Sequence, residues 1–371
     1  MVSGTGTRHP ESQMPRLFRI ISILSFSIFI LYHITFSTEY YFYKGRNFGS
    51  EALFNPINMV LNGGYGIMQL DGHSRDVINL PYRMGAKNVW HNITNPGGPI
   101  SHYGWGDFLT NEIFPINFKR EYMQWLPNYE LHLIGGGMTS RAIYEWYDLH
   151  HYPAPRALMI GTMGVYHFLN EVVENGAYQG DNVDPISDID VFDVSSVILF
   201  SFNNVDKFFS EKLNLSDWSL MPSFDFQDHS IQNNGQNFSI KWKLPYIKRL
   251  YFFRYFGLTD LTGASYKLSN GSYISFGGGV RTKSLVMLDE AKQRKTISMV
   301  GNVGLFYDRD NSLLCSFIFG GSADKRLNLN IYPGVVHLWK FTPGLWTFMN
   351  RKGDFTFGMI TTWTPGLAFR P

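Results

Sequence analysis

Residues 216–371 alternate between apolar and polar side chains, and this alternation constrains the fold more than any other feature of the chain. In one run, for example, Ser239 separates Phe238 from Ile240. The same period of two recurs in segments 262–268, 274–281, 297–305, 327–331 and 355–359. Successive side chains of a strand point to opposite faces, so the pattern predicts a β-sheet with one apolar and one polar face.

The composition indicates which face of this sheet points outward. The polar face is rich in Gly, Ser and Asn and also carries the charged residues Lys241, Lys243, Lys267 and Arg281. A soluble barrel turns its apolar face inward, whereas an outer-membrane barrel turns it outward and keeps a polar interior. The chain is 16% aromatic, contains 36 Gly and is only 17% charged, which favours the second arrangement over an aromatic-rich soluble β domain.

We therefore expect an α+β protein that is associated with a membrane. Residues 38–215 form a mainly helical section, and residues 216–371 form an antiparallel β-barrel or a strongly curved β-sheet. Helices are expected from Thr139 to His150 and from Ala157 to Asn175, and a strand from Tyr129 to Ile134. Glycines 161 and 164 predict close packing of another helix, and Ser269-Asn270-Gly271 predicts a tight hairpin turn.

The N-terminal segment has the pattern of an export signal. Residues 20–36 contain no Asp, Glu, Lys or Arg, and Arg16 and Arg19 precede them. A positive region before an apolar run is typical of a signal peptide, and the run is almost long enough for a membrane anchor. We therefore assign 16–37 to a signal peptide or anchor, and 1–15 to disorder. Either assignment exports the remaining chain, so we expect a cell-envelope protein of a bacterial-type outer membrane.

Candidate chemistry is concentrated in a polar island within the second predicted helix. His167, Asn170, Glu171 and Glu174 have the spacing i, i+3, i+4 and i+7, which places them on one helix face. An acid one turn from a histidine can orient it as a general base, or both can bind a metal ion. The predicted catalytic residues are His167 as base, Glu171 orienting it, and Glu174 or Asp188 assisting.

A structural interpretation of the same residues stays open. Asp184 can cap a helix that starts at Pro185, and Asp188 can interact with the dipole of its first turn. In this interpretation Glu171 and Glu174 pair with arginines such as Arg141 or Arg156. The Glu-x-x-His spacing of di-metal bundles is absent, so the sequence names neither a metal nor a cofactor. The histidines at 91, 102 and 132 are interpreted as hydrogen-bonding residues of loops or sheets.

Several classes of function lack their sequence signature. The net charge is +2, with 32 basic and 30 acidic residues, and no dense run of Lys or Arg indicates nucleic acid as a partner. The G-x-S-x-G and P-loop motifs are absent, and the single Cys315 excludes an internal disulfide. Membrane lipid is the expected partner, and no protein partner is indicated.

Two functions fit these observations. The first is a bacterial-type outer-membrane or envelope β-barrel protein with a helical, plug-like section, serving structure, assembly or ligand passage. The alternative is an envelope enzyme, a lipid- or glycan-directed hydrolase that uses the His/Glu helix face.

Overall fold

The computed structural model describes residues 39–115, 126–290 and 292–370, all within a compact unit that spans Ser37–Pro371. The disorder expected at 1–15 and the signal peptide or anchor expected at 16–37 lie outside the described residues. Among the described helices, none is both long enough and apolar enough to cross a membrane. The expected order of a helical section followed by a sheet is confirmed.

The helical section is built from short helices and turns that precede the sheet. The α-helices are α2 (Pro56–Gly64), α3 (Tyr82–Thr94), α4 (Gly97–Tyr103), α5 (Trp105–Asp107), α6 (Gly136–Leu149), α7 (Pro155–Asn175), α8 (Val194–Leu199) and α9 (Asn203–Lys207). The 3₁₀-helices are η1 (Ser50–Leu53) and η2 (Gly66–Gln69). The π-helices are η3 (Phe108–Ile113), η5 (Leu126–Gly135), η6 (Ile186–Asp193) and η7 (Phe208–Lys212).

The two longest expected helices are present, and two finer predictions are wrong. Residues 129–134, expected as a strand, belong to η5, whose Leu131 and Ile134 pack into a cluster around Met138 and Phe238. Among the described residues, nothing lies within 4 Å of a Cβ added at Gly161 or Gly164, so no described helix packs closely there. The close approach occurs instead at Gly63 of α2, where an added Cβ would lie 1.9 Å from the Tyr166 ring of α7.

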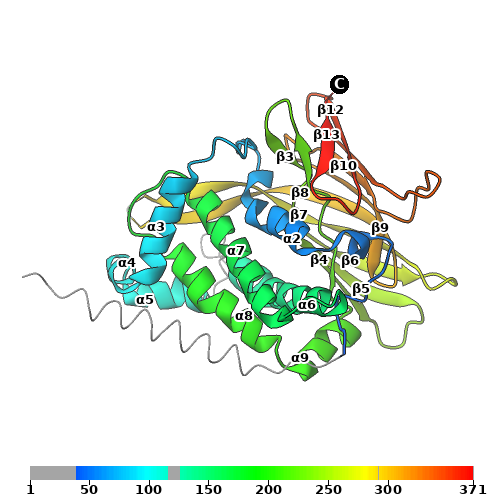
Figure 1. Ribbon diagram of the computed structural model, residues 1–371, viewed down its shortest axis with the longest axis horizontal. Helices are drawn as coiled ribbons and strands as arrows, with labels where there is room; N and C mark the ends of the chain where they lie inside the picture. Colours follow the sequence, from blue (N-terminus) through cyan, green and yellow to red (C-terminus); the bar gives the residue numbers. More distant parts are fainter. Residues whose placement is uncertain (1–38, 116–125, 291, 371) are drawn as a thin grey trace, which may run out of the picture. The chain divides into compact units, whose positions relative to one another are not determined.

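The strands form one large mixed sheet. In chain order they are β1 (Ser216–Asp217), β2 (Ser223–Asp225), β3 (Ser230–Gln232), β4 (Asn237–Lys243), β5 (Leu250–Gly257), β6 (Thr259–Lys267), β7 (Tyr273–Asp289), β8 (Arg294–Arg309), β9 (Ser312–Gly320), β10 (Leu327–Ile331), β11 (Gly344–Met349), β12 (Phe355–Ile360) and β13 (Gly366–Phe369). Their order within the described residues is β1-β4-β5-β6-β7-β8-β9-β10-β11-β12-β13-β2-β3. Figure 1 shows the helices grouped on one side of the long strands β7 and β8.

The sheet is open, so the antiparallel β-barrel, one of the two predicted arrangements, is wrong. Segment 216–225 contains both β1, which pairs with β4, and β2, which pairs with β13. Strands β4 to β13 alternate in direction, so β13 runs parallel to this segment and pairs with β2 in parallel. β1 and β2 are successive parts of this one segment and do not pair with each other. The sheet therefore ends with β1 at one edge and β3 at the other.

The hairpin turn predicted between β6 and β7 is confirmed. Leu268 and Ser272 are joined by a backbone hydrogen bond, and the Gly271 N–H donates to the Leu268 carbonyl. Gly271 has φ of 87°, a conformation that glycine adopts without strain. The register that follows pairs Ala264 with Phe276 and Gly263 with Gly277.

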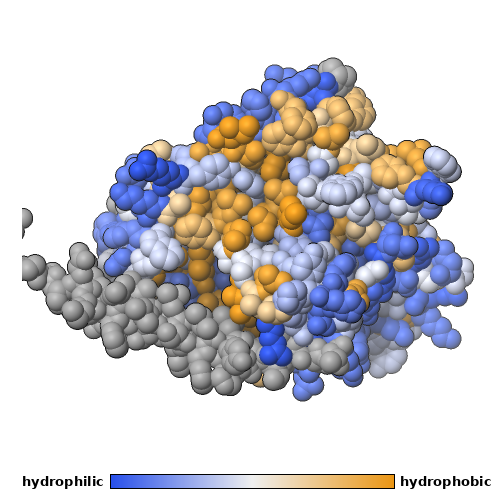
Figure 2. Space-filling model, in the orientation of Figure 1, coloured by the Kyte–Doolittle hydropathy of each residue, from blue (hydrophilic) through white to orange (hydrophobic). Residues whose placement is uncertain are grey.

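The two faces of the sheet differ, although the enclosed face is less polar than the alternation predicts. The enclosed face buries a cluster that includes Trp218, Phe253 and Phe306, together with polar side chains such as Ser275 and Asn330. The other face exposes large apolar side chains, among them Ile274, Phe276, Val303, Leu305, Phe317, Phe319, Phe355, Phe357, Leu367 and Phe369. Figure 2 shows hydrophobic residues gathered around the middle and upper part of the surface in view.

Candidate functional site

The polar face of α7 is buried and meets η5 and η6. His167 and Glu171 are only 4% and 3% exposed, and Asp188 of η6 is 6% exposed. The structure therefore brings together three of the four predicted site residues in one enclosed region. It adds His132 from η5 and Asp193 from the end of η6.

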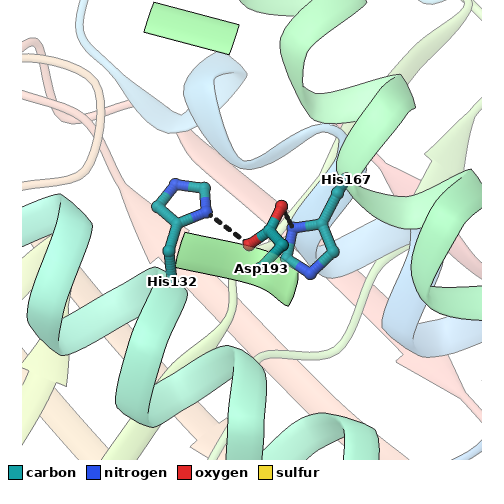
Figure 3. Close-up of side chains that lie close together, drawn as sticks. All are labelled: His132, His167 and Asp193. Carbon is teal, nitrogen blue, oxygen red and sulfur yellow. Dashed lines mark hydrogen bonds and ion pairs between the residues drawn. The ribbon is translucent and has the colours of Figure 1, made fainter. Parts of the chain in front are cut away.

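Asp193 is the centre of this cluster because it bridges two histidines. His132 Nδ1 lies 2.9 Å from Asp193 Oδ1, and His167 Nδ1 lies 2.8 Å from Asp193 Oδ2 (Figure 3). On the other side of the His132 ring, Nε2 lies 3.3 Å from Asp188 Oδ2. Asp188 also accepts a hydrogen bond of 3.0 Å from the Ser187 hydroxyl. The chain of contacts thus runs from His167 through Asp193 and His132 to Asp188.

The geometry changes the role expected for Glu171. The sequence predicted that Glu171 orients His167, but the carboxylate beside the His167 ring nitrogen belongs to Asp193. Glu171 instead forms a group with His132 and Asp188, in which one ligand atom of each residue lies within 4.8 Å of the others. Glu171 therefore adds a third buried carboxyl group to the cluster, on the His132 side.

Glu174 and Asp184 face a cation that the sequence did not indicate. Lys295 Nζ, on β8, lies 3.0 Å from Glu174 Oε1 and 4.0 Å from Asp184 Oδ2. Pairing of Glu174 with Arg141 is thus wrong, and Arg141 instead contacts Glu145 and Asp206. The predicted cap is also wrong, because Pro185 is the N-cap of η6 and no side chain caps it.

Burial and mutual charge shift the pKa values of this cluster. Burial raises the pKa of Asp188 to about 7, although His132 opposes the shift. Burial, together with Asp188 and Asp184, raises the pKa of Glu171 well above its usual range. Burial alone would lower the pKa of His132, but Asp188 and Asp193 raise it to about 10.

Asp193 differs from the other acids of the cluster. Burial would raise the pKa of its carboxyl, but His167 and His132 together hold that pKa below its usual value. Asp193 is therefore ionised at neutral pH, whereas Asp188 titrates near neutral pH. A carboxyl group with such a pKa, next to a histidine, can exchange protons with a bound molecule.

A cavity of about 210 Å³ adjoins the cluster. His132, Asp188 and Glu174 lie in its wall, and Leu258, Leu285 and Ile297 are among its apolar lining residues. The strands also contribute charged residues to the wall, among them Asp260 and Lys295. Such a combination of an apolar surface with a few polar groups is typical of sites for small molecules.

Two residues of the cluster were missed because of their local structure. His132 was interpreted as a hydrogen-bonding residue of a loop or sheet, whereas it lies in η5. Asp188 and Asp193 are five residues apart, and the i→i+5 hydrogen bonds of a π-helix bring that spacing onto one face. The α-helical spacing of three or four residues, which the sequence analysis used, does not place these two acids on one face.

The chain matches no protein-family model, no curated protein and no solved structure. Its own site and surface are therefore the basis for a functional proposal.

Proposed function

We propose that this chain is a membrane-associated protein of the cell envelope, in which the outward face of the sheet contacts lipid. The observation that carries the proposal is a row of side chains at one level of strands β4 to β13. The register joins Trp242, Phe252, Ala264, Phe276, Leu305, Phe317, Leu329, Thr347, Phe357 and Phe369 as successive cross-strand neighbours. We call this row the apolar belt.

The exposure of the belt supports contact with an apolar phase. Phe276 is 57% exposed, Leu305 is 48% exposed and Phe357 is 46% exposed. Isolated exposed apolar residues are ordinary, but a contiguous apolar surface marks a protein or membrane contact. A row that follows ten neighbouring strands fits a bilayer better than it fits the limited footprint of one protein partner.

The packing of the enclosed face bears on what such a protein does. Trp218, Phe253 and Phe306 fill the space inside the curved sheet with aromatic contacts. A filled interior is expected of a sheet that anchors or supports a helical section, and it argues against ligand passage through that part of the sheet. We therefore favour a structural or anchoring role for the sheet.

The lipid proposal predicts a large difference between two arginine substitutions. Leu305→Arg is expected to destabilise the protein in lipid vesicles by about 2–4 kcal/mol, because it places a charge at the apolar belt. Tyr246→Arg is the control, since Tyr246 is fully exposed in the loop between β4 and β5 and away from the belt. Urea unfolding in vesicles measures both, and cell fractionation measures membrane recovery. Equal effects of the two variants, or recovery of the wild-type protein in a detergent-free soluble fraction, would contradict the proposal.

The cavity favours a second candidate, an envelope hydrolase acting on lipids or glycans. His132 and Asp188 stand at a cavity that is also lined by apolar side chains such as Leu285 and Ile297, which a lipid chain could contact. On this proposal Asp188→Asn lowers the hydrolysis rate by about 10²–10⁴-fold, the usual range for loss of a general acid or base. The control is His102→Ala, which removes an exposed His–Asp pair with Asp181. Assays of the full chain in lipid micelles that show no hydrolysis, or an unchanged rate for Asp188→Asn, end this candidate.

A further inference from the structure

His167 is buried without the hydrogen bonds that an imidazole ordinarily makes in a protein interior. Its side chain is 5% exposed, and neither ring nitrogen has a hydrogen-bond partner among the described residues. Nδ1 does lie 2.8 Å from Asp193 Oδ2, but the contact lacks the angular geometry of a hydrogen bond. Buried polar atoms are almost always satisfied, so this ring calls for a partner beyond the described residues.

We propose that His132, His167 and Asp193 bind a divalent transition-metal ion. Two imidazoles and one carboxylate form a donor set that suits Zn²⁺, Mn²⁺ or Fe²⁺. Ca²⁺ and Mg²⁺ prefer sites built from oxygen ligands, so two nitrogen donors disfavour them. The three residues come from η5, α7 and η6, and Figure 3 shows the Asp193 carboxylate lying between the two histidine rings.

The spacing of the donor atoms fits coordination of one ion. One ligand atom from each of the three residues lies within 4.8 Å of the others. The contacts of Asp193 with the two Nδ1 atoms are 2.9 and 2.8 Å long. Ligands bound at about 2.0–2.1 Å to a common ion stand roughly 2.8–3.4 Å apart at octahedral or tetrahedral angles. Small side-chain movements would therefore turn the direct contacts into the edges of a coordination sphere.

The surroundings of His132 match those of a metal-bound histidine. A ligating histidine usually directs its second ring nitrogen to a carboxylate, which fixes the orientation of the ring. His132 Nε2 lies 3.3 Å from Asp188 Oδ2, and Ser187 in turn donates to Asp188. Asp188 is therefore the supporting carboxylate, while Nδ1 faces Asp193 and the proposed ion.

The local charge also favours a cation at this place. Glu171, Asp188 and Asp193 are buried carboxyl groups that share one region with the two histidines. The nearby Lys295 is engaged by Glu174 and Asp184. Buried carboxylates are stabilised when they pair with a cation or coordinate a metal, so a divalent ion would offset the excess of acids. The inference does not depend on contact between the sheet and lipid.

The test uses the full chain purified in detergent, stripped with a chelator and then titrated with Zn²⁺, Mn²⁺ and, without oxygen, Fe²⁺. We expect about one tightly bound ion per chain by elemental analysis. At a free metal concentration about 100-fold above the dissociation constant, the thermal midpoint should rise by about 4 °C. The proposal is overturned if the stripped chain takes up none of the three ions and its thermal midpoint does not change. The cluster would then be a network of histidines and aspartates without a metal ion.

Variants locate the bound ion. His167→Gln and Asp193→Asn should each weaken binding more than about tenfold, whereas His102→Gln, in the exposed pair with Asp181, should leave it unchanged. Wild-type affinity in both site variants overturns the proposal, because the ion then binds elsewhere. If these variants do not fold, X-ray absorption of the metal-loaded wild-type chain decides. Two imidazole ligands are expected, and an ion without imidazole ligands contradicts the assignment.

Discussion

Arg141→Met is expected to destabilise the protein by about 3–5 kcal/mol, because it leaves two buried acids without their cation. The Arg141 side chain is fully buried, its Nε donates to Glu145 Oε1 at 2.9 Å, and its Nη1 lies 3.5 Å from Asp206 Oδ2. Burial already raises the pKa of Asp206 to about 8 although Arg141 opposes that shift. Urea unfolding followed by far- and near-ultraviolet circular dichroism measures the loss.

The substitution should also loosen the residues that precede η1. Glu145 accepts hydrogen bonds from the backbone N–H groups of Tyr41 and Tyr43, so its orientation fixes that segment. The Arg141 Nη2 donates to the carbonyl of Glu39 as well. Amide exchange in residues 39–43 should therefore rise more than in the strands.

The matched control is Arg351→Met. Arg351 is exposed in the turn between β11 and β12, so its loss should change stability by no more than about 0.5 kcal/mol. An effect of Arg141→Met as small as that of the control would show that Glu145 and Asp206 do not need the guanidinium. The interpretation of this cluster as a buried ion-pair network would then be wrong.

The sequence predicts the sheet well because alternation is a local property. Leu305 and Phe306 are adjacent, and their burial follows from the period of two: Leu305 is exposed and Phe306 is buried. The turn at Asn270-Gly271 is equally local, since its backbone conformation depends on the residues themselves. The pairing of β13 with β2 is different, because this parallel contact joins residues about 140 positions apart. No local pattern in β13 or in β2 indicates that the two strands pair.

The site was predicted only in part for the same reason. α7 carries His167 and Glu171 at helical spacing, so their common face could be predicted from the sequence. Their partners come from η5 and η6, and the pairing of His132 with Asp193 spans 61 residues. The π-helical turns also change which residues share a face, and no α-helical pattern shows this in advance. Helical spacing in the sequence therefore predicts the cluster residues of α7, but not their partners in η5 and η6.

The buried ion pair on the enclosed face of the sheet could also be predicted only in part. Alternation predicts that Lys241 shares the polar face of β4 with Ser239, but it does not name the acid that the lysine meets. The structure gives that acid as Asp308 of β8, 67 residues away. Lys241 is 1% exposed and Asp308 is fully buried, so each charge depends on the other.

Lys241→Met is therefore expected to destabilise the protein by about 3–5 kcal/mol, because it leaves Asp308 charged or protonated without a cation. The lysine ammonium also lies 4.2 Å from the centroid of the Tyr273 ring, a contact that adds to its stabilisation. Burial lowers the pKa of Lys241 and raises that of Asp308, and the attraction between the two charges opposes both shifts. Equilibrium unfolding of the full chain in detergent or lipid measures the change.

Two further variants test whether the loss comes from the broken ion pair rather than from any lysine substitution in β4. Lys243→Met, two residues along the same strand and exposed, should change stability by no more than about 0.5 kcal/mol. Adding Asp308→Leu to Lys241→Met should recover most of the loss, because two apolar side chains of similar size replace a buried ion pair at little or no cost. Such a recovery would show that each of the two buried charges is stabilised mainly by the other. A double variant as unstable as the sum of the two single variants would instead show that each side chain acts through its own packing.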